Sequence, residues 1–169
     1  MERPLGDRQR AVGVQAENTV TQLSERLRFG LLPLIARLLL SLEFLVAVNG
    51  KISGWSGQAA YMASHGMRFI PPLLGAALAI ELFGSICVIT GFYARAAAAT
   101  MFVYLGIVSI ELHDFWNRSG GSAGMNQTEF FKNMGMMGGL LLLAVYGPGS
   151  WTLGALMDSA RAARAMRLE

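Results

Sequence analysis

The sequence has few of the residues on which soluble enzymes and secreted proteins depend. Only 15% of its 169 residues are charged, and it contains one cysteine and two histidines. A single cysteine, Cys87, excludes an intrachain disulfide and a Cys-x-x-Cys redox motif, so we interpret it as a small packing residue. The formal net charge of +3 is small, and the arginines lie mainly at the two ends of the chain. This distribution of charge indicates membrane topology rather than nucleic-acid binding.

The residues that would carry a redox centre are also missing. A haem would need paired histidines within the membrane, an iron–sulfur cluster would need several cysteines, and a flavin would need a glycine-rich motif. His65 and His113 are both expected near the outer surface, without the carboxylate spacing of a metal site. No metal, no resident cofactor and no catalytic residue is therefore predicted, and the residues leave open whether the protein is an enzyme.

What the sequence does contain is apolar. Hydrophobic residues make up 53% of the chain, together with 20 glycines. A helix of about 20 apolar residues spans the roughly 30 Å hydrocarbon core of a bilayer. The sequence predicts an all-α integral membrane four-helix bundle within residues 29–150, with spans at about 29–49, 71–91, 94–113 and 128–147.

Arginines sit mainly at the two ends of the chain. Residues 1–28 are predicted to form a loosely ordered arm with a short helix near 18–28, and no apolar signal-peptide region follows its first arginines. Residues 151–169 are predicted to form either a basic amphipathic tail on the membrane surface, with Met166 on its apolar face and Arg167 on its basic face, or a frayed solvated end. Arm, tail and the turn at Arg95 hold nine arginines, so we expect both termini on the cytoplasmic side of the membrane.

Between the spans, residues 50–70 are predicted to be a loop with a short helix at 57–64, and residues 117–126 a flexible Gly/Ser loop. Pro33 is expected to be tolerated in the first turns of its helix. The Gly-x-x-x-Gly spacing of Gly135 and Gly139 predicts close approach of another helix.

Two layers of charge are predicted inside the membrane. In the inner layer, Arg37 lies about 12 Å and Glu81 about 15 Å from the inner face, so an ion pair between them is expected. It would either fasten two helices together or form a functional site. On the second span the inward face is small and polar, and it consists of Ala77, Glu81, Gly84, Ser85 and Val88.

The outer layer lies at about 21–24 Å and contains Glu43, Glu111 and Lys132, with His113 and Asp114 just above. Two carboxylates that compete for one lysine cannot both ionise cheaply, so one of them is expected to hold a proton. The cluster would serve proton exchange or recognition of a polar ligand head, or it would be a satisfied polar plug.

An ordered set of short motifs resembles the DoxX family, a group of small four-span membrane proteins, over residues 32–153. The motifs are the arginine of the first span followed by Asn-Gly-Lys-Ile at 49–52, Glu81-Leu-Phe-Gly84, Gly91 leading to Arg95-Ala-Ala, His113, Phe131-Lys132-Asn133 and Gly147-Pro-Gly149. Segments 49–52 and 125–127 are most similar to its enterobacterial YphA-like branch. The chain departs from the family pattern at Thr152-Leu153-Gly154 and in its long arm.

The resemblance implies a bacterial inner-membrane location and a link to quinone-reducing oxidoreductases or oxidative-stress complexes. A quinone is the one cofactor that it suggests. The two layers of charge give the candidate intramembrane polar site, which consists of Arg37, Glu43, Glu81, Glu111, His113 and Lys132. Two other functions stay open: a scaffold or assembly factor for membrane or periplasmic proteins, and a small proton-coupled carrier. The partners expected are the lipid bilayer, such proteins, and a second copy of the chain.

Overall fold

The computed structural model describes residues 5–165, and throughout that range the only regular structure is helical. The predicted features at residues 1–4 and 166–169, including Met166 and Arg167, lie outside the described residues. In chain order the elements are α1 (Leu5–Arg26), the π-helical turn η1 (Leu27–Leu31), α2 (Leu32–Ser53), α3 (Trp55–Ser64), α4 (Ile70–Thr90), α5 (Ala94–Leu112), the short 3-10 turn η2 (Phe115–Asn117), α6 (Gly120–Tyr146) and α7 (Leu153–Ala165).

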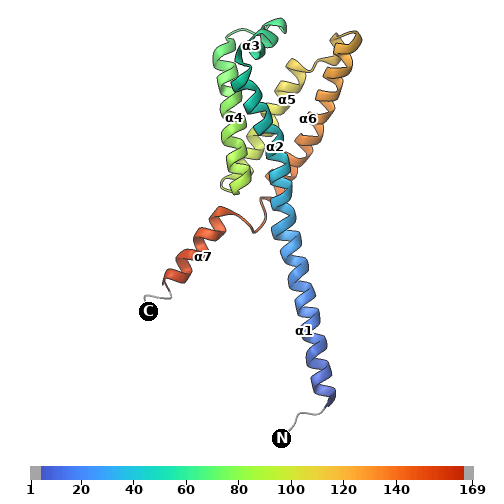
Figure 1. The fold of residues 1–169 in the computed structure, drawn as a ribbon, viewed down its shortest axis with the longest axis vertical. Coiled ribbons are helices and arrows are strands. Elements are labelled where there is room, and N and C mark those ends of the chain that lie inside the picture. Colours follow the sequence, from blue (N-terminus) through green and yellow to red (C-terminus); the bar gives the residue numbers. More distant parts are fainter. Residues whose placement is uncertain (1–4, 166–169) are drawn as a thin grey trace.

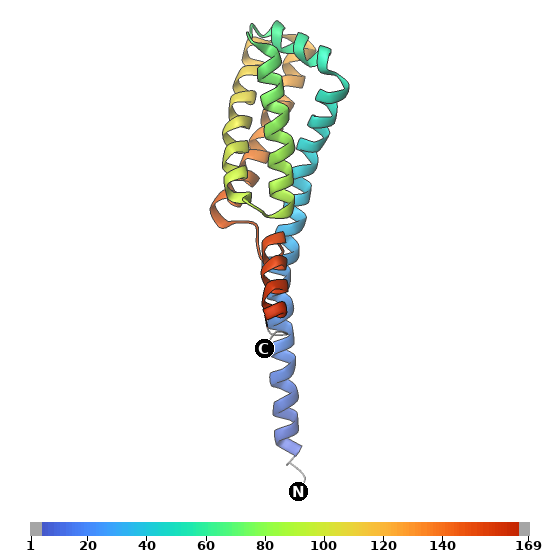
Figure 2. The same cartoon turned by 90° about the vertical axis from the view of Figure 1, so that its left-hand side faces the viewer.

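Four long helices, α2, α4, α5 and α6, pack side by side (Figure 1). Helix α2 packs on α4, α4 on α5, and α5 on α6, whereas α6 and α2 touch far less. Helices α1 and α7 both leave this group at one end, which we call the terminal end, and α3 covers the opposite end, the α3 end (Figure 2).

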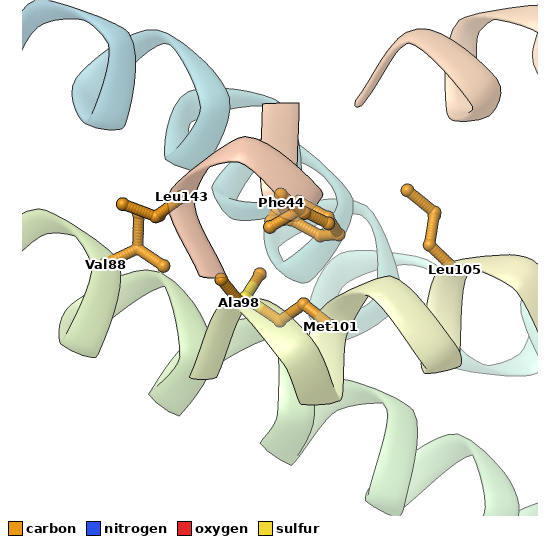
Figure 3. Close-up of a cluster of buried hydrophobic side chains, with 7 residues drawn as sticks. Phe44, Val88, Ala98, Met101, Leu105 and Leu143 are labelled. Carbon is orange, nitrogen blue, oxygen red and sulfur yellow. The ribbon is translucent and has the colours of Figure 1, made fainter. Parts of the chain in front are cut away.

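The core between these helices is small and apolar. Phe44, Ala98, Met101 and Leu140 are each at most 2% exposed, and Figure 3 shows this cluster with its neighbours Val88, Leu105 and Leu143. On α4 the predicted inward face is confirmed, because Glu81, Ser85 and Val88 are buried while Phe83 is 64% exposed. Large apolar side chains therefore face outward, as expected where the surrounding solvent is lipid.

Helix ends follow proline and glycine. Pro71 and Pro72 open α4, where a missing N–H costs nothing. Gly91 ends the same helix in the left-handed region, at φ 75°. Gly147 ends α6 at φ 88°, and Pro148 follows it. The segment 147–152 between α6 and α7, called the connector below, then turns back against the start of α2.

Pro33 positions this connector. Proline has no N–H, so the carbonyl of Phe29, four residues earlier, loses its helical partner. Ser150 supplies a substitute from the connector: its backbone N–H lies 2.6 Å and its hydroxyl 2.9 Å from that carbonyl oxygen. The backbone adapts by forming η1 just before Pro33. Gly30, within η1, leaves room for the indole of Trp151, whose Nε1 would lie only 2.6 Å from an added Cβ.

Three local expectations were wrong. The arm is not loosely ordered with a short helix at 18–28, because α1 is helical from residue 5 and runs through η1 into α2. The loop expected from residue 50 begins only at Gly54, so Lys51 lies on α2. The predicted Gly/Ser loop is helical from Gly120 onward. Ser119, whose backbone is extended, is the N-cap residue that precedes α6. A glycine costs a helix only about 1 kcal/mol, so α2 continues through Gly50 and α6 begins at Gly120.

Three helical stretches among residues 5–165 are long and apolar enough to cross a membrane. They cover Glu17–Ser53, Ile70–Thr90 and Ala94–Asn117. Helix α6 is long enough, but Glu129, Lys132 and Asn133 interrupt its apolar sequence.

Candidate functional site

A buried ion pair joins α2 to α4 near the middle of α4. The ammonium of Lys51 lies 2.8 Å from each carboxylate oxygen of Glu81. The hydroxyl of Tyr104, on α5, donates to the Oε1 atom of Glu81 at 2.6 Å. The Glu81 side chain is 5% exposed and that of Lys51 is 15% exposed. Three helices are thus connected through one carboxylate that accepts three short hydrogen bonds.

The predicted ion pair between Arg37 and Glu81 is wrong. Arg37 is level with Gly91, because an added Cβ on Gly91 would lie 2.5 Å from Arg37 Nη1. Gly91 is ten residues beyond Glu81 along α4, about 15 Å of helix, which an arginine side chain cannot cover. Lys51 reaches Glu81 instead because α2 continues to residue 53.

Arg37 makes a different contact, at the terminal end. Its Nη2 atom donates to the carbonyl of Trp151 in the connector. The residue is only 2% exposed, and its Nε and Nη1 atoms have no hydrogen-bond partner among the described residues. The hydroxyls of Ser41 and Ser85, on α2 and α4, are also buried without a partner there. The structure therefore holds a buried guanidinium whose charge no described acid balances.

A groove of about 690 Å³ separates α2 from α6. It follows from the limited contact between these helices, and its lining is mostly apolar: Pro33, Ala36, Arg37, Leu39, Leu40, Lys132, Gly135, Met136, Gly139, Leu142, Leu143, Tyr146 and Gly147. The spacing of Gly135 and Gly139 was predicted to permit close approach of another helix. This holds at Gly139, where an added Cβ would lie 3.5 Å from Leu40 of α2, but not at Gly135, which faces the open groove. An added Cβ on Gly135 would meet nothing within 4 Å.

Lys132 lies at one end of the groove, between two acids. Its ammonium is 2.8 Å from Glu43 and 2.6 Å from Glu129. The three side chains are 38–45% exposed, so the cluster is not buried within the chain. The prediction of one lysine with two carboxylates is right in number, but its second acid is wrong, because Glu111 is exposed and Glu129 takes its place.

His113 and Asp114 belong to a third polar cluster at the α3 end. Nδ1 of His113 lies 3.3 Å from Oδ1 of Asn126. Asp114 accepts a 2.8 Å hydrogen bond from Nε of Arg118. The Tyr61 hydroxyl donates to the Leu112 carbonyl at 2.7 Å and lies 3.1 Å from Asn126. Burial raises the pKa of Tyr61, so its hydroxyl keeps the proton that it donates.

Sequence reasoning missed the partners that complete these clusters. Lys51 was assigned to a loop, although only Gly50 separated it from the apolar helix. Tyr104 was given no role, although a phenol in mid-span needs a hydrogen-bond acceptor. Glu129 stands three residues before Lys132, the spacing that brings side chains together on one helix face.

The polar clusters supply charged groups and proton donors and acceptors, and the groove between α2 and α6 supplies an apolar surface. Across the described residues, no group of three His, Cys, Asp or Glu side chains forms a candidate metal site. Cys87 is free and half-buried.

Apolar helices of membrane-spanning length, with ion pairs between and beside them, define the class as a multi-pass membrane protein. The DoxX family model matches residues 32–114, and the SURF4 family model matches residues 78–156. The chain belongs to the DoxX family.

Two relatives support this assignment and the inner-membrane location. The chain is 34% identical to inner membrane protein YphA of Escherichia coli (strain K12) over 71% of its length and 86% of the relative's. It is 32% identical to inner membrane protein YqjF of the same organism over 74% of its length and 91% of the relative's. No solved structure matches the chain.

Proposed function

We propose that α2, α4, α5 and α6 form a four-helix bundle that crosses the inner membrane, with both termini in the cytoplasm. The terminal end supports this topology, since α1, η1, the start of α5 and α7 all carry arginines there: Arg26, Arg28, Arg95, Arg161 and Arg164. Basic residues remain on the cytoplasmic side of inner-membrane proteins. Helix α6 is the fourth span: Lys132 lines the groove, and Asn133 faces the neighbouring α5, where it donates to Ser109.

We infer that the protein is the membrane subunit of a quinone-linked oxidoreductase and binds the quinone ring at the Lys132 end of the α2–α6 groove. The observation that carries this proposal is the groove itself, with one lysine between two acids beside an apolar lining. Its volume falls within the range of small-molecule sites, about 300–1,000 Å³.

The chemistry divides between two proteins. Reduction of a quinone to a quinol takes up two electrons and two protons. The Lys132 ammonium donates a hydrogen bond to a quinone carbonyl. Glu43 and Glu129 take up protons from water and pass them to the quinone oxygens. The described residues offer no haem, cluster or flavin ligands, so an electron-donating partner protein supplies the electrons.

Photolabelling in membranes tests this site. A quinone with a photoreactive group is expected to label residues of the groove in the wild-type protein. Lys132→Met removes the ammonium, and Gly135→Leu fills the open space beside Gly135. Lys132→Met should lower labelling about tenfold, the effect of losing one hydrogen bond to a charged group. Gly135→Leu should also lower labelling, because its side chain occupies the space that the quinone needs.

Glu111→Gln is the matched control, because Glu111 is an exposed acid outside the groove lining. It should leave labelling unchanged. Labelling that is distributed equally over all lipid-facing helices, or that persists in both groove variants, would rule out the quinone site.

A scaffold is the second candidate, and α1 is the observation that favours it. This 22-residue helix extends away from the four packed helices (Figure 1), with Val20 68% and Leu23 58% exposed. An extended helix with uncovered apolar residues is suited to contact with a partner protein. Deleting residues 1–20 should then abolish copurification of a stoichiometric partner while the remaining chain stays in the membrane.

A further inference from the structure

The guanidinium of Arg37 is a buried charge without a described counter-ion. Within residues 5–165 its Nε and Nη1 atoms have no partner, and its one hydrogen bond goes to a neutral carbonyl, that of Trp151. An arginine remains protonated in proteins, so it cannot escape the cost of burial by losing its proton. None of the residues that line the groove beside it is acidic. The site therefore favours an anion from outside the chain.

The position of Arg37 indicates which anion can arrive. Its Nη1 atom lies against Gly91, at the turn that ends α4 on the terminal side. Phe92 and Tyr93 in that turn are 54% and 70% exposed, and Tyr146 at the end of α6 is 77% exposed. Exposed aromatic residues at helix ends mark the level of lipid headgroups. Arg37 is thus at the depth of phosphates, and not at the bilayer centre.

The groove leads from this level along α2 and α6. Leu39 and Leu142 on its two sides are 66% and 60% exposed, so it opens toward the lipid. Gly139 lines it without a side chain, and an added Cβ there would be in ordinary contact with Leu40 at 3.5 Å. An apolar channel that ends at an unpaired cation matches one acyl chain with an acidic headgroup.

We propose that the α2–α6 groove binds one acidic phospholipid, with its phosphate at Arg37 and an acyl chain past Gly139. This site uses the end of the groove opposite Lys132 and does not depend on quinone binding. The anionic lipids of the inner leaflet supply the ligand. The phosphate would complete the hydrogen bonds of Arg37 beside the connector and so couple the lipid to the junction of α6 and α7.

Native mass spectrometry of the full chain from nanodiscs tests the proposal. The nanodiscs contain phosphatidylethanolamine and phosphatidylglycerol in equal amounts. The wild-type protein is expected to retain one phosphatidylglycerol in preference to phosphatidylethanolamine. Arg37→Gln should reduce that preference about tenfold or more, the factor that one hydrogen bond to a charged group supplies.

Arg95→Gln is the matched control. Arg95 lies at the same end and donates to the Tyr146 carbonyl at 3.3 Å, but it does not line the groove. This variant loses the same positive charge and should retain the bound lipid. Equal loss of bound phosphatidylglycerol in both variants would show that general surface charge holds the lipid, and it would overturn the proposed site.

A second variant keeps the test decisive if Arg37→Gln does not fold. Gly139→Leu preserves the arginine and narrows the acyl path, so it should also lose the retained lipid. Three results would overturn the proposal: no preference in the wild-type protein, a fatty acid in place of the phospholipid, or a lipid-free dimer in which a second copy covers the groove. If the wild-type protein shows no groove-specific quinone labelling but retains the lipid, only the quinone site is refuted. If it shows that labelling but retains no phosphatidylglycerol, only the lipid site is refuted.

Discussion

Removing Lys51 or Glu81 from their ion pair should destabilise the protein to different extents. Lys51→Met leaves the carboxylate of Glu81, 5% exposed, with only the Tyr104 hydroxyl as a partner. Removing one member of a buried pair costs about 3–5 kcal/mol, because the other charge stays buried. Glu81→Gln leaves the lysine, which is nearer the end of α2 and 15% exposed, and a long lysine side chain can turn toward the interface.

The two single variants should therefore differ in stability. We expect Lys51→Met to lower the free energy of unfolding by about 3–5 kcal/mol. Glu81→Gln should cost less, about 1–3 kcal/mol, because glutamine still accepts the hydrogen bond from Tyr104. For a chain of this size each kcal/mol shifts Tm by about 2–4 °C, so the Lys51 variant should unfold roughly 6–20 °C below the wild type.

Thermal unfolding in a mild detergent, followed by tryptophan fluorescence, measures this difference. Combining both substitutions removes the unpaired charge, so the double variant should be more stable than Lys51→Met alone. As a control, Arg161→Met breaks an exposed 3.6 Å pair with Asp158 and should change stability by less than about 1 kcal/mol. If Glu81→Gln proves as destabilising as Lys51→Met, or if the two effects simply add, the reasoning fails.

Three further substitutions test the terminal end and the α3 end. Gly30→Leu should displace the Trp151 indole, since an added Cβ would lie 2.6 Å from its Nε1, and a red shift of tryptophan emission would report it; unchanged emission would contradict the packing. Pro33→Ala returns an N–H to the carbonyl four residues earlier, so amides of the connector should exchange with solvent faster, and unchanged exchange would show that the proline does not set its position. Tyr61→Phe removes the hydrogen bonds to the Leu112 carbonyl and Asn126. It should lower the free energy of unfolding by about 1–2 kcal/mol in the same thermal assay. An unchanged free energy of unfolding would mean that water replaces the hydroxyl.

The sequence determined the helical class and the inward face of α4. Long apolar runs need their backbone hydrogen bonds satisfied within the segment, which in lipid requires a helix. Periodicity then placed Glu81 on the inward face of α4, because one charged residue among small neighbours cannot face hydrocarbon. Both conclusions depend only on local sequence, so they could be drawn without coordinates. The ordered motifs likewise identified the family before any comparison.

Tertiary structure decided which charges meet. The choice between Arg37 and Lys51 as the partner of Glu81 depends on where α2 ends and how it is staggered against α4, and neither is written in the periodicity of one helix. The same holds for Glu129 replacing Glu111 beside Lys132, which depends on the rotation of α6. The groove exists because α2 and α6 approach each other only locally, as at Gly139 and Leu40, and stay apart beside Gly135. An ion pair needs its atoms within about 4 Å, so a shift of a single turn, 5.4 Å, changes the partner while every helix stays the same.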